Sequence, residues 1–525
     1  MMERVYVSLS TLLVVGGVPA QFFVFLVLGS VTATTLGNYR AQRAALLREE
    51  NAMVFGGRLQ FEPGERFVND ILMAAKREEL AKGFRTPSKF APSRSFLESA
   101  GDIENSEVFG LIKRMPKGAV LHSHASAIVS NEFVLNVTYR DDLYVCESGV
   151  NSGDRLTLRF FDEPDDACDW RLLSGLRKNP ELRTVNERID KQLSLYDPSS
   201  SRNDYDDGDA AWTKFVKIFE FITPLLTYKP VYEEHYYQAL KELHDDNVLY
   251  LEIRSTLPSL YELNGTEYDP VETARLYKEV TERFVKDHPK FAGAKLIYAP
   301  GKTADPVRFD EYLRVALELK RTMPDFFAGF DLVGQEDRST PLTTWIEKIQ
   351  TIADDMPFFF HAGETNWSGT NVDENLIDAV LLGANRIGHG YALVKHPKVL
   401  EIVKEKGIAI EVSPISNQVL CLVKDLRNHP ASALFVDDFP VVVSNDDPGL
   451  WRASGLSYDF YEAFVGIMSA HADIRSIKQL AINSIKYSSL NDAEKNRTMS
   501  IWNDVTRFCN ARMRNATSHI KKSKK

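Results

Sequence analysis

The hydrophobic pattern of this chain repeats one unit, in which a short apolar run is followed by polar residues and then by a stretch with helical spacing. Apolar runs fall at 119–124, 248–254, 294–299, 326–333, 358–361, 385–388, 408–412 and 439–444. Amphipathic segments such as 309–322 and 376–382 lie between them. Eight strand–helix units predict an α/β fold, and they favour a closed (β/α)8 barrel of the TIM type over an open sheet.

Two segments interrupt or precede this alternation. Residues 34–105 show helical spacing and carry no obvious chemistry, so they predict a helical arm that either forms an oligomer contact or packs on the barrel. Residues 139–209 are rich in Asp, Ser, Asn and Gly and are too long for an ordinary loop. They predict a small insertion after the first strand, with the barrel built from 106–138 and 210–515 and a basic tail at 516–525.

The N-terminus has the pattern of a secretory signal peptide. Arg4 precedes a long apolar stretch at 5–31 that is interrupted by Pro19, and small residues follow at the usual cleavage position. We therefore expect residues 1–33 to be removed and the mature protein to be extracellular. The stretch is long for a signal, so an uncleaved membrane anchor is the alternative.

Cysteines and glycosylation sequons agree with an extracellular destination. The chain has four cysteines, and Cys146 and Cys168 lie in the same polar segment, which predicts a local disulfide there. Cys421 and Cys509 are expected to be buried thiols, although a bridge between them is also compatible with the sequence. Acceptor sequons begin at Asn136, Asn264, Asn496 and Asn515, and a fifth, at Asn366, lies too near the candidate chemistry for us to expect its use.

Size and charge limit the classes of function. A chain of 525 residues, 44% of them hydrophobic, can bury a large core. Its formal net charge of −10 argues against general binding of nucleic acids, which requires a basic surface. The lysine-rich residues 519–525 are a local exception, and most such tails are solvated.

The candidate chemistry follows the ends of four apolar runs. His122 and His124 are two residues apart on a strand and therefore face the same side. His361 ends a second run and Asp446 follows the last one. Because a parallel barrel gathers the carboxyl ends of its strands at one face, these four side chains predict one metal site, and three imidazoles with a carboxylate suit Zn²⁺.

Three more residues near these ligands predict hydrolysis. A zinc ion makes hydroxide available near neutral pH, and an attack on an electron-poor carbon then needs a proton donor. Glu364 is placed for that role, His389 could orient the attacking water, and Asp447 could assist it. The Asp446–Asp447 pair could instead cap a helix that begins at Pro448.

The ordered motifs resemble a known family. Met115-Pro-Lys-Gly-x-x-Leu-His-x-His124, His361-Ala-Gly-Glu, Arg386-Ile-Gly-His-Gly, Ser413-Pro-x-Ser-Asn417 and Ser444-Asn-Asp-Asp-Pro are similar to those of adenosine deaminases in the metal-dependent amidohydrolase group. The signal, the helical arm, the cysteine-bearing insertion and the segment 330–337 resemble more closely the secreted adenosine deaminase-related growth factors, the type 2 extracellular deaminases.

This resemblance implies specific roles. Zinc would be held by His122, His124, His361 and Asp446. Glu364 would protonate N1 of the purine, His389 would act on the water that attacks C6, Asp447 would contact N7, and the backbone N–H of Gly334 would contact N3. Adenosine would yield inosine and ammonia. The resemblance also implies a homodimer formed through the arm, and an insertion that binds a cell-surface receptor or polysaccharide.

One position departs from the family pattern. An Asp commonly follows the second histidine and contacts the ribose, whereas this chain has Ala125. Ribose recognition must therefore differ, and the preference between adenosine and 2′-deoxyadenosine becomes open. Trp212 and Glu252 are candidate replacements near the mouth of the pocket, although the sequence favours a structural role for each. Two other functions remain: a catalytically silent, growth-factor-like binding protein on a deaminase scaffold, and a hydrolase of adenine or AMP.

Overall fold

The computed structural model describes residues 36–147, 155–178, 184–196, 208–436 and 439–523. The predicted signal peptide, residues 1–33, lies outside these ranges. The chain divides into two compact units, residues 1–50 and 51–525. Helix α1 (Leu36–Ala52) belongs almost entirely to the first unit, and all of its side chains are at least partly exposed. Among the described residues, no helix has both the length and the apolar character needed to cross a bilayer.

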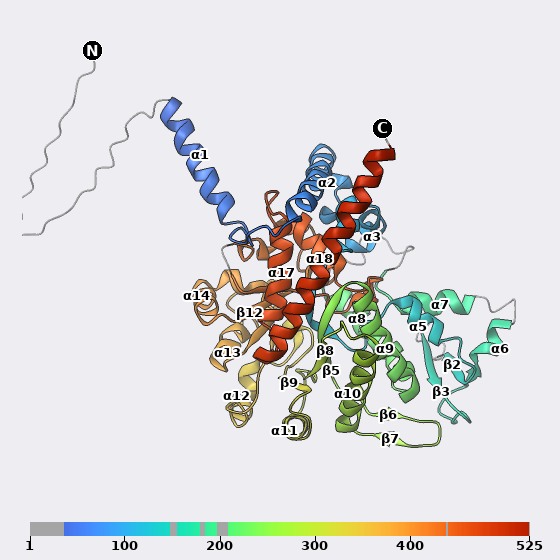
Figure 1. Ribbon diagram of the computed structural model, residues 1–525. Coiled ribbons are helices and arrows are strands. Elements are labelled where there is room, and N and C mark those ends of the chain that lie inside the picture. The colour runs from blue at the N-terminus through green and yellow to red at the C-terminus, as the bar shows by residue number, and fades with distance from the viewer. Residues whose placement is uncertain (1–35, 148–154, 179–183, 197–207, 437–438, 524–525) are drawn as a thin grey trace, which may run out of the picture. The chain divides into compact units, whose positions relative to one another are not determined.

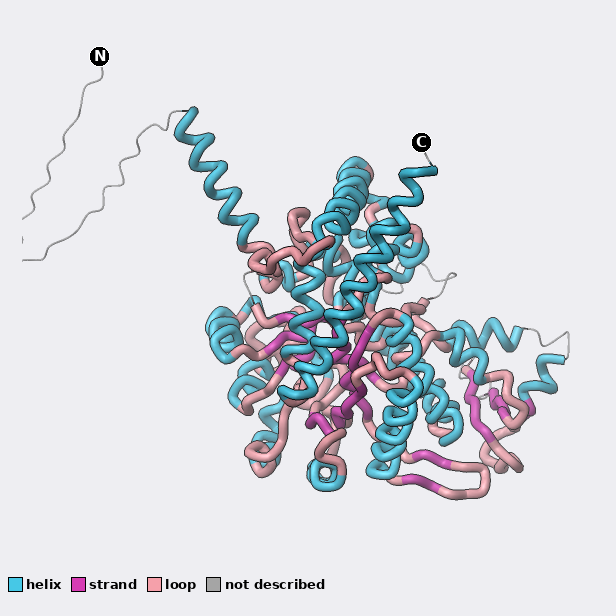
Figure 2. Tube along the Cα trace, viewed as in Figure 1, coloured by secondary structure: helices cyan, strands magenta, loops and turns pink. Residues whose placement is uncertain are grey.

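The second unit contains the predicted barrel of eight parallel strands. The strands are β1 (Gly118–His124), β5 (Val248–Ser255), β8 (Gly293–Tyr298), β9 (Phe327–Phe330), β10 (His361–Ala362), β11 (Arg386–His389), β12 (Ala409–Val412) and β13 (Val441–Val443). They pair in sequence order as β1-β5-β8-β9 and β10-β11-β12-β13. Figures 1 and 2 show these strands in the middle of the unit with helices around them.

Two short parallel bridges close the ring. Phe330 pairs with Phe358, which joins β9 to the segment before β10. Ser123 pairs with Asp446, which joins β1 to the end of β13. At this second bridge the N–H of His124 donates to the carbonyl of Asp446 at 3.0 Å, and the N–H of Asp446 donates to the carbonyl of His122 at 3.1 Å. The α/β barrel expected from the sequence is confirmed.

Several strands are shorter than their apolar runs. The run at 358–361 contributes only the first residue of β10, His361, and the run at 326–333 contributes β9 only. The remaining residues of these runs are buried except Val333, which is partly exposed and forms a single bridge with Gly301. An apolar run predicts that a segment is buried, whereas the limits of a strand depend on where a neighbouring backbone lies close enough for hydrogen bonding.

Helices surround the barrel, and two of them begin with clear side-chain caps. The surrounding helices are α8 (Gly208–Leu226), α9 (Lys229–Asp245), α10 (Pro270–Asp287), α11 (Pro306–Thr322), α12 (Ile346–Gln350), α13 (Asn375–Leu381), α14 (Pro397–Lys406), α15 (Pro414–Val419), α16 (Ser457–Tyr461), α17 (Ile474–Lys486) and α18 (Asp492–Ser523). At α10, Asp269 and Glu272 form a reciprocal capping box ahead of a proline at the first position. Asp305 caps α11 in a similar way by accepting from two backbone N–H groups.

The segment after β1 forms a small module of its own. After α5 (Asn131–Val137), strands β2 (Leu143–Glu147), β3 (Leu156–Phe160) and β4 (Arg171–Leu172) form an antiparallel sheet in the order β3-β2-β4. Helices α6 (Leu173–Lys178) and α7 (Thr184–Gln192) follow. The predicted disulfide between Cys146 and Cys168 is present, and it ties β2 to the segment before β4. A two-stranded hairpin, β6 (Leu260–Tyr261) with β7 (Glu267–Tyr268), was not predicted.

The remaining helices of the second unit precede the barrel. They are α2 (Glu65–Arg85), α3 (Phe96–Glu104) and α4 (Glu107–Ile112). Apolar residues of α2 and α3, among them Leu72 and Phe96, are fully buried in the main hydrophobic core of the unit. These helices therefore pack on the barrel region, and a role of the arm in dimerisation stays a prediction.

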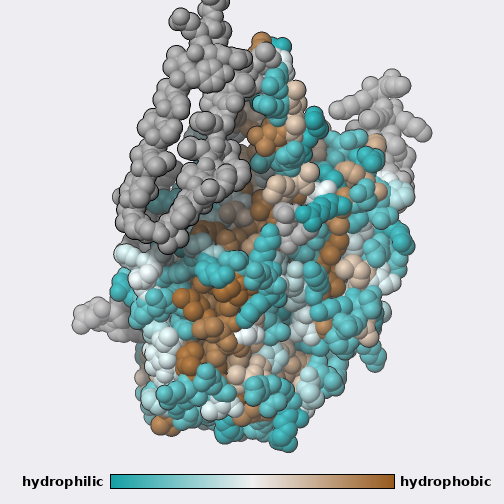
Figure 3. Space-filling view, turned by 90° about the vertical axis from the view of Figure 1, so that its left-hand side faces the viewer, coloured by the Kyte–Doolittle hydropathy of each residue, from teal (hydrophilic) through white to brown (hydrophobic). Residues whose placement is uncertain are grey.

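Two surface features concern the predicted sequons and the apolar residues on one side of the molecule. Asn136, Asn264 and Asn496 are exposed, and the side chain of Asn515 lies outside the described residues. Figure 3 shows the side that carries α12, α13 and α14 in Figure 1, where apolar residues gather between polar areas. On α13, the exposed apolar side chains are Ile377 and Leu381.

Candidate active site

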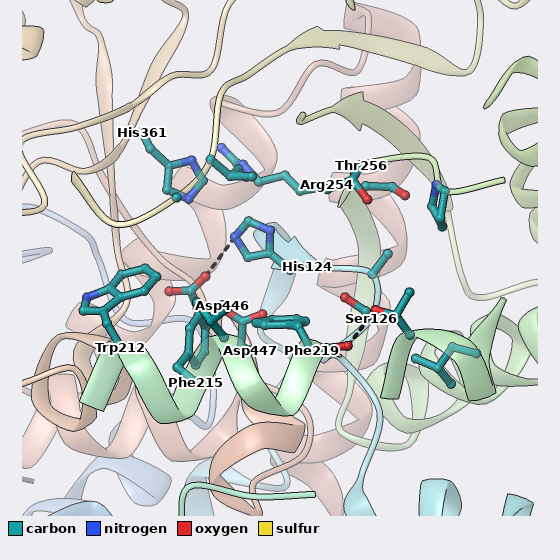
Figure 4. A pocket seen from close by; sticks show the side chains of 18 of the residues that line it. His124, Ser126, Trp212, Phe215, Phe219, Arg254, Thr256, His361, Asp446 and Asp447 are labelled. Atoms are coloured by element: carbon teal, nitrogen blue, oxygen red, sulfur yellow. Dashed lines mark hydrogen bonds and ion pairs between the residues drawn. The ribbon is translucent and has the colours of Figure 1, made fainter. Parts of the chain in front are cut away.

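The four predicted metal ligands meet at the carboxyl end of the barrel. One nitrogen each from His122, His124 and His361 and one oxygen from Asp446 all lie within 4.8 Å of one another. The Nε2 atoms of His122 and His124 are 3.3 and 3.1 Å from Oδ1 of Asp446. Figure 4 shows His124 and Asp446 facing each other, with His361 nearby. Three strand ends, β1, β10 and the segment after β13, thus supply the set.

Buried charged residues hold the rings of His122 and His361 by hydrogen bonds on the side away from the metal site. Nδ1 of His122 donates to Glu411 at 2.8 Å, and Nδ1 of His361 donates to Asp331 at 2.7 Å. Arg254 links both carboxylates, with Nε 2.8 Å from Asp331 and Nη2 2.7 Å from Glu411. Because a carboxylate only accepts hydrogen bonds, each ring in its neutral form carries its hydrogen on Nδ1 and presents the lone pair of Nε2 toward the site. This donor set fits a divalent transition-metal ion.

Glu364 lies beside the ligand set on a constrained turn. Gly363, between His361 and Glu364, has φ of +71°, and a Cβ at that position would lie 2.7 Å from Leu376. The Gly363 N–H donates to the buried carboxylate of Glu336, which also pairs with Lys302. Burial, together with the negative charge of Asp446, raises the pKa of the Glu364 carboxyl well above its ordinary range. Glu364 is therefore a buried carboxylic acid that can hold a proton.

His389 and Asp447 complete the polar part of the site. Nε2 of His389 is 3.6 Å from Oε1 of Glu364 and 3.6 Å from Oδ2 of Asp446. Burial lowers the pKa of His389 well below its ordinary value, so the imidazole is neutral. Burial and the adjacent Asp446 raise the pKa of Asp447. His389 and Asp446 both have φ near +60°, a left-handed conformation that costs a non-glycine residue about 1 kcal/mol or more.

A cavity of about 320 Å³ leads to these groups. Its walls include His124, Ala125, Gly334, Glu364 and Asp447. One face of α8 forms an aromatic wall, on which Trp212, Phe215 and Phe219 lie one helical turn apart (Figure 4). The cavity is concave, mostly apolar, and has a few polar groups at its inner end, as small-molecule sites do.

The structure corrects one candidate and reveals residues that sequence reasoning missed. Trp212 and Gly334 line the cavity, but Glu252 does not. Glu252 is fully buried, lies two residues before Arg254 and deeper in the barrel, and accepts from Arg386 at 2.6 Å. Asp331 and Glu411 were missed. A carboxylate inside the apolar run 408–412 was the one signal that could have identified Glu411.

Comparison with known proteins agrees with this geometry. Residues 188–505 match the family described as Adenosine deaminase, and residues 21–112 match the Adenosine/AMP deaminase N-terminal family. An adenosine deaminase of Phlebotomus duboscqi is 45% identical over 471 residues, covering 89% of this chain and 90% of its own length. The human protein named adenosine deaminase 2 is 42% identical over 472 residues, covering 88% of this chain and 91% of its own length.

Solved structures agree on the fold. The N6-mAMP deaminase of Arabidopsis has a TM-score of 0.53 at 17% identity, covering 75% of this chain and 99% of its own. An amidohydrolase from Burkhoderia ambifaria, solved with bound Zn, has a TM-score of 0.52 at 18% identity, covering 77% of this chain and 93% of its own. With its ligand set, its barrel and these relatives, the chain belongs to the adenosine deaminase family and is a hydrolase of the adenosine deaminase 2 type.

Proposed function

We propose that this protein is a secreted, zinc-dependent adenosine deaminase that converts adenosine, and also 2′-deoxyadenosine, to the corresponding inosine and ammonia. One observation carries the proposal: the buried carboxyl of Glu364, whose pKa is raised by burial and by Asp446, lies next to the ligand set of His122, His124, His361 and Asp446 at the inner end of a cavity. We choose adenosine as the substrate because the relatives are named adenosine deaminase.

Each side chain then has a role that its surroundings support. A zinc ion bound by the three histidines and Asp446 supplies Lewis acidity, which lowers the pKa of water toward neutrality. Glu364 donates its proton to N1 of the purine, which makes C6 electron-poor. His389 holds the attacking water, Asp447 contacts N7, and the N–H of Gly334 contacts N3.

The remaining parts of the proposal concern location and partners. The apolar N-terminus, the exposed sequons and the Cys146–Cys168 disulfide support secretion. The arm at 34–105 would form a homodimer, and the insertion at 139–209 would bind a cell-surface receptor or polysaccharide, as the family resemblance implies.

The decisive experiment uses purified full-length protein from a secreting host. Conversion of adenosine to inosine is followed by ultraviolet absorbance, and zinc content is measured on the same sample. We expect turnover with one zinc per chain. Bound zinc without turnover of adenosine, 2′-deoxyadenosine, adenine or AMP would instead support a catalytically silent binding protein. Turnover of AMP or adenine alone would show that one of these, and not adenosine, is the substrate.

A further inference from the structure

Three buried imidazoles face the active site, and they differ in what lies behind them. His122 and His361 each have a carboxylate at Nδ1, at 2.8 and 2.7 Å. A carboxylate accepts only, so each Nδ1 carries a hydrogen, and in the neutral ring that metal ligation requires each Nε2 presents a lone pair. These two rings are therefore set as acceptors toward the centre of the site, as metal ligands must be.

His389 has an amide behind it instead. Nδ1 of His389 lies 3.2 Å from the side-chain nitrogen of Asn417, which is fully buried on α15. An amide can offer either its NH₂ or its oxygen, and the two ends have almost the same shape. The direction of this hydrogen bond must therefore be deduced from the other partner of Asn417.

That partner is His429, and the hydrogen bonds that run from Ala431 through His429 to Asn417 have only one possible direction. The backbone N–H of Ala431 donates to Nδ1 of His429 at 3.0 Å, and a backbone N–H can only donate. Burial lowers the pKa of His429 to about 3, so its ring is neutral and its other nitrogen, Nε2, carries the hydrogen. Nε2 then donates to the oxygen of Asn417 at 3.0 Å. The NH₂ of Asn417 is left to donate to Nδ1 of His389.

The chain consequently fixes the tautomer of His389. With Nδ1 occupied as an acceptor, the hydrogen of the neutral ring is on Nε2. The Nε2 atom lies on the active-site side of the ring, 3.6 Å from Oε1 of Glu364 and 3.6 Å from Oδ2 of Asp446. It is thus opposite in character to the Nε2 atoms of His122 and His361.

We propose that Asn417 and His429 are positioning residues that hold His389 as an Nε2–H donor, so that His389 orients the attacking water by donating to its oxygen. This inference rests on the proposed deaminase function for its kinetic consequence. The hydrogen-bond chain itself is independent of that function. Neither Asn417 nor His429 lines the cavity, so both act through His389.

The test replaces the donor NH₂ of Asn417 and so reverses the direction of its hydrogen bond with His389. Asn417→Asp keeps the shape of the side chain but can only accept, so His389 would move its hydrogen to Nδ1. His429→Gln is the matched control, because its oxygen can accept from Ala431 while its NH₂ donates to Asn417. His429→Leu removes the directing group and leaves Asn417 free to turn.

Two measurements are made on the zinc-loaded full-length protein. In ¹⁵N-histidine NMR, with the His389 signals assigned from a His389→Gln sample, we expect a protonated Nε2 in the wild type and in His429→Gln, and a protonated Nδ1 in Asn417→Asp. In kinetics, we expect kcat of Asn417→Asp to fall by about 100-fold or more at little-changed KM and zinc content, because a lost oriented donor acts on the transition state. His429→Leu should lie between the two.

The proposal is overturned by a wild-type His389 protonated at Nδ1, or by an Asn417→Asp protein that keeps both its tautomer and its kcat. If Asn417→Asp does not fold, the comparison of His429→Leu with His429→Gln decides the same question. Absence of turnover in all proteins would refute the proposed function, while the NMR result would still decide the direction of the chain.

Discussion

The carboxylate of Asp331 receives two hydrogen bonds from a single residue, His361. The backbone N–H of His361 donates to Oδ1 at 2.9 Å, and Nδ1 of its ring donates to Oδ2 at 2.7 Å. Both the main chain and the ring of this ligand are therefore fixed by one buried side chain. Arg254 holds Asp331 in turn, at 2.8 Å.

Asp331→Asn should weaken metal binding while leaving all four ligands in place. An amide can turn its NH₂ toward the ring and so compete with the tautomer that ligation needs, and loss of such a support typically costs 10- to 100-fold in metal affinity. Titration with a competing chelator measures the effect. Asp310→Asn, at an exposed ion pair with Lys348, is the control and should bind metal like the wild type. Equal affinities of the two variants would contradict the support role.

Glu364→Gln should retain zinc and lose turnover. The amide occupies the same volume but has no proton to give to the purine, and removal of a general acid costs about 10²- to 10⁴-fold. Zinc content and the rate of inosine formation are measured together. Glu374→Gln, at an exposed residue of the same segment, serves as the control. A fully active Glu364→Gln protein would show that another group donates the proton.

Trp212→Ala should raise KM more than it lowers kcat. The indole forms part of the aromatic wall of α8, and the loss of such a contact costs roughly 1.4 kcal/mol, or about tenfold in binding. Steady-state kinetics with adenosine and 2′-deoxyadenosine would show whether the effect depends on the sugar. Lys217→Ala, at an exposed position of the same helix outside the cavity lining, is the matched variant and should change KM little. A Trp212→Ala protein with unchanged KM would assign Trp212 to structure alone.

His235→Leu should reduce the loss of stability in acid. Burial lowers the pKa of His235, on α9, from 6.5 to about 3. Between these values the unfolded chain binds a proton that the folded chain does not, so stability falls as pH falls, by up to about 1.4 kcal/mol per unit. Melting temperatures from pH 7 to pH 4 should therefore decline less in the variant. An exposed control, His471→Leu, should follow the wild type. Parallel curves for His235→Leu and the wild type would contradict this account.

The sequence predicted the barrel because the alternation of apolar runs and amphipathic helices is a local signal. The ends of those runs also identified His122, His361 and Asp446, because residues that follow parallel strands converge in space. Strand limits were predicted less well. The run at 358–361, for example, contributes one residue to β10, since pairing depends on a neighbour that is distant in sequence.

The residues that orient the ligands were missed for a related reason. Asp331 and Glu411 are linked to the histidines by contacts across 30 and 289 residues, which no spacing rule records. Glu252 was placed wrongly at the cavity mouth because composition does not reveal depth along a strand. Two residues further along β5, Arg254 reaches the cavity wall, while Glu252 stays in the interior.

The bridge between Ser123 and Asp446 has a consequence for the whole barrel. The residue that makes the last backbone link of the ring also carries one of the four ligand side chains, and two others, His122 and His124, lie directly across that link. An ion held there would join the first strand to the last, so its binding free energy would add to the stability of the closed ring. Metal binding and folding are then linked equilibria. A chelator should therefore lower the melting temperature of the protein as well as its rate of deamination.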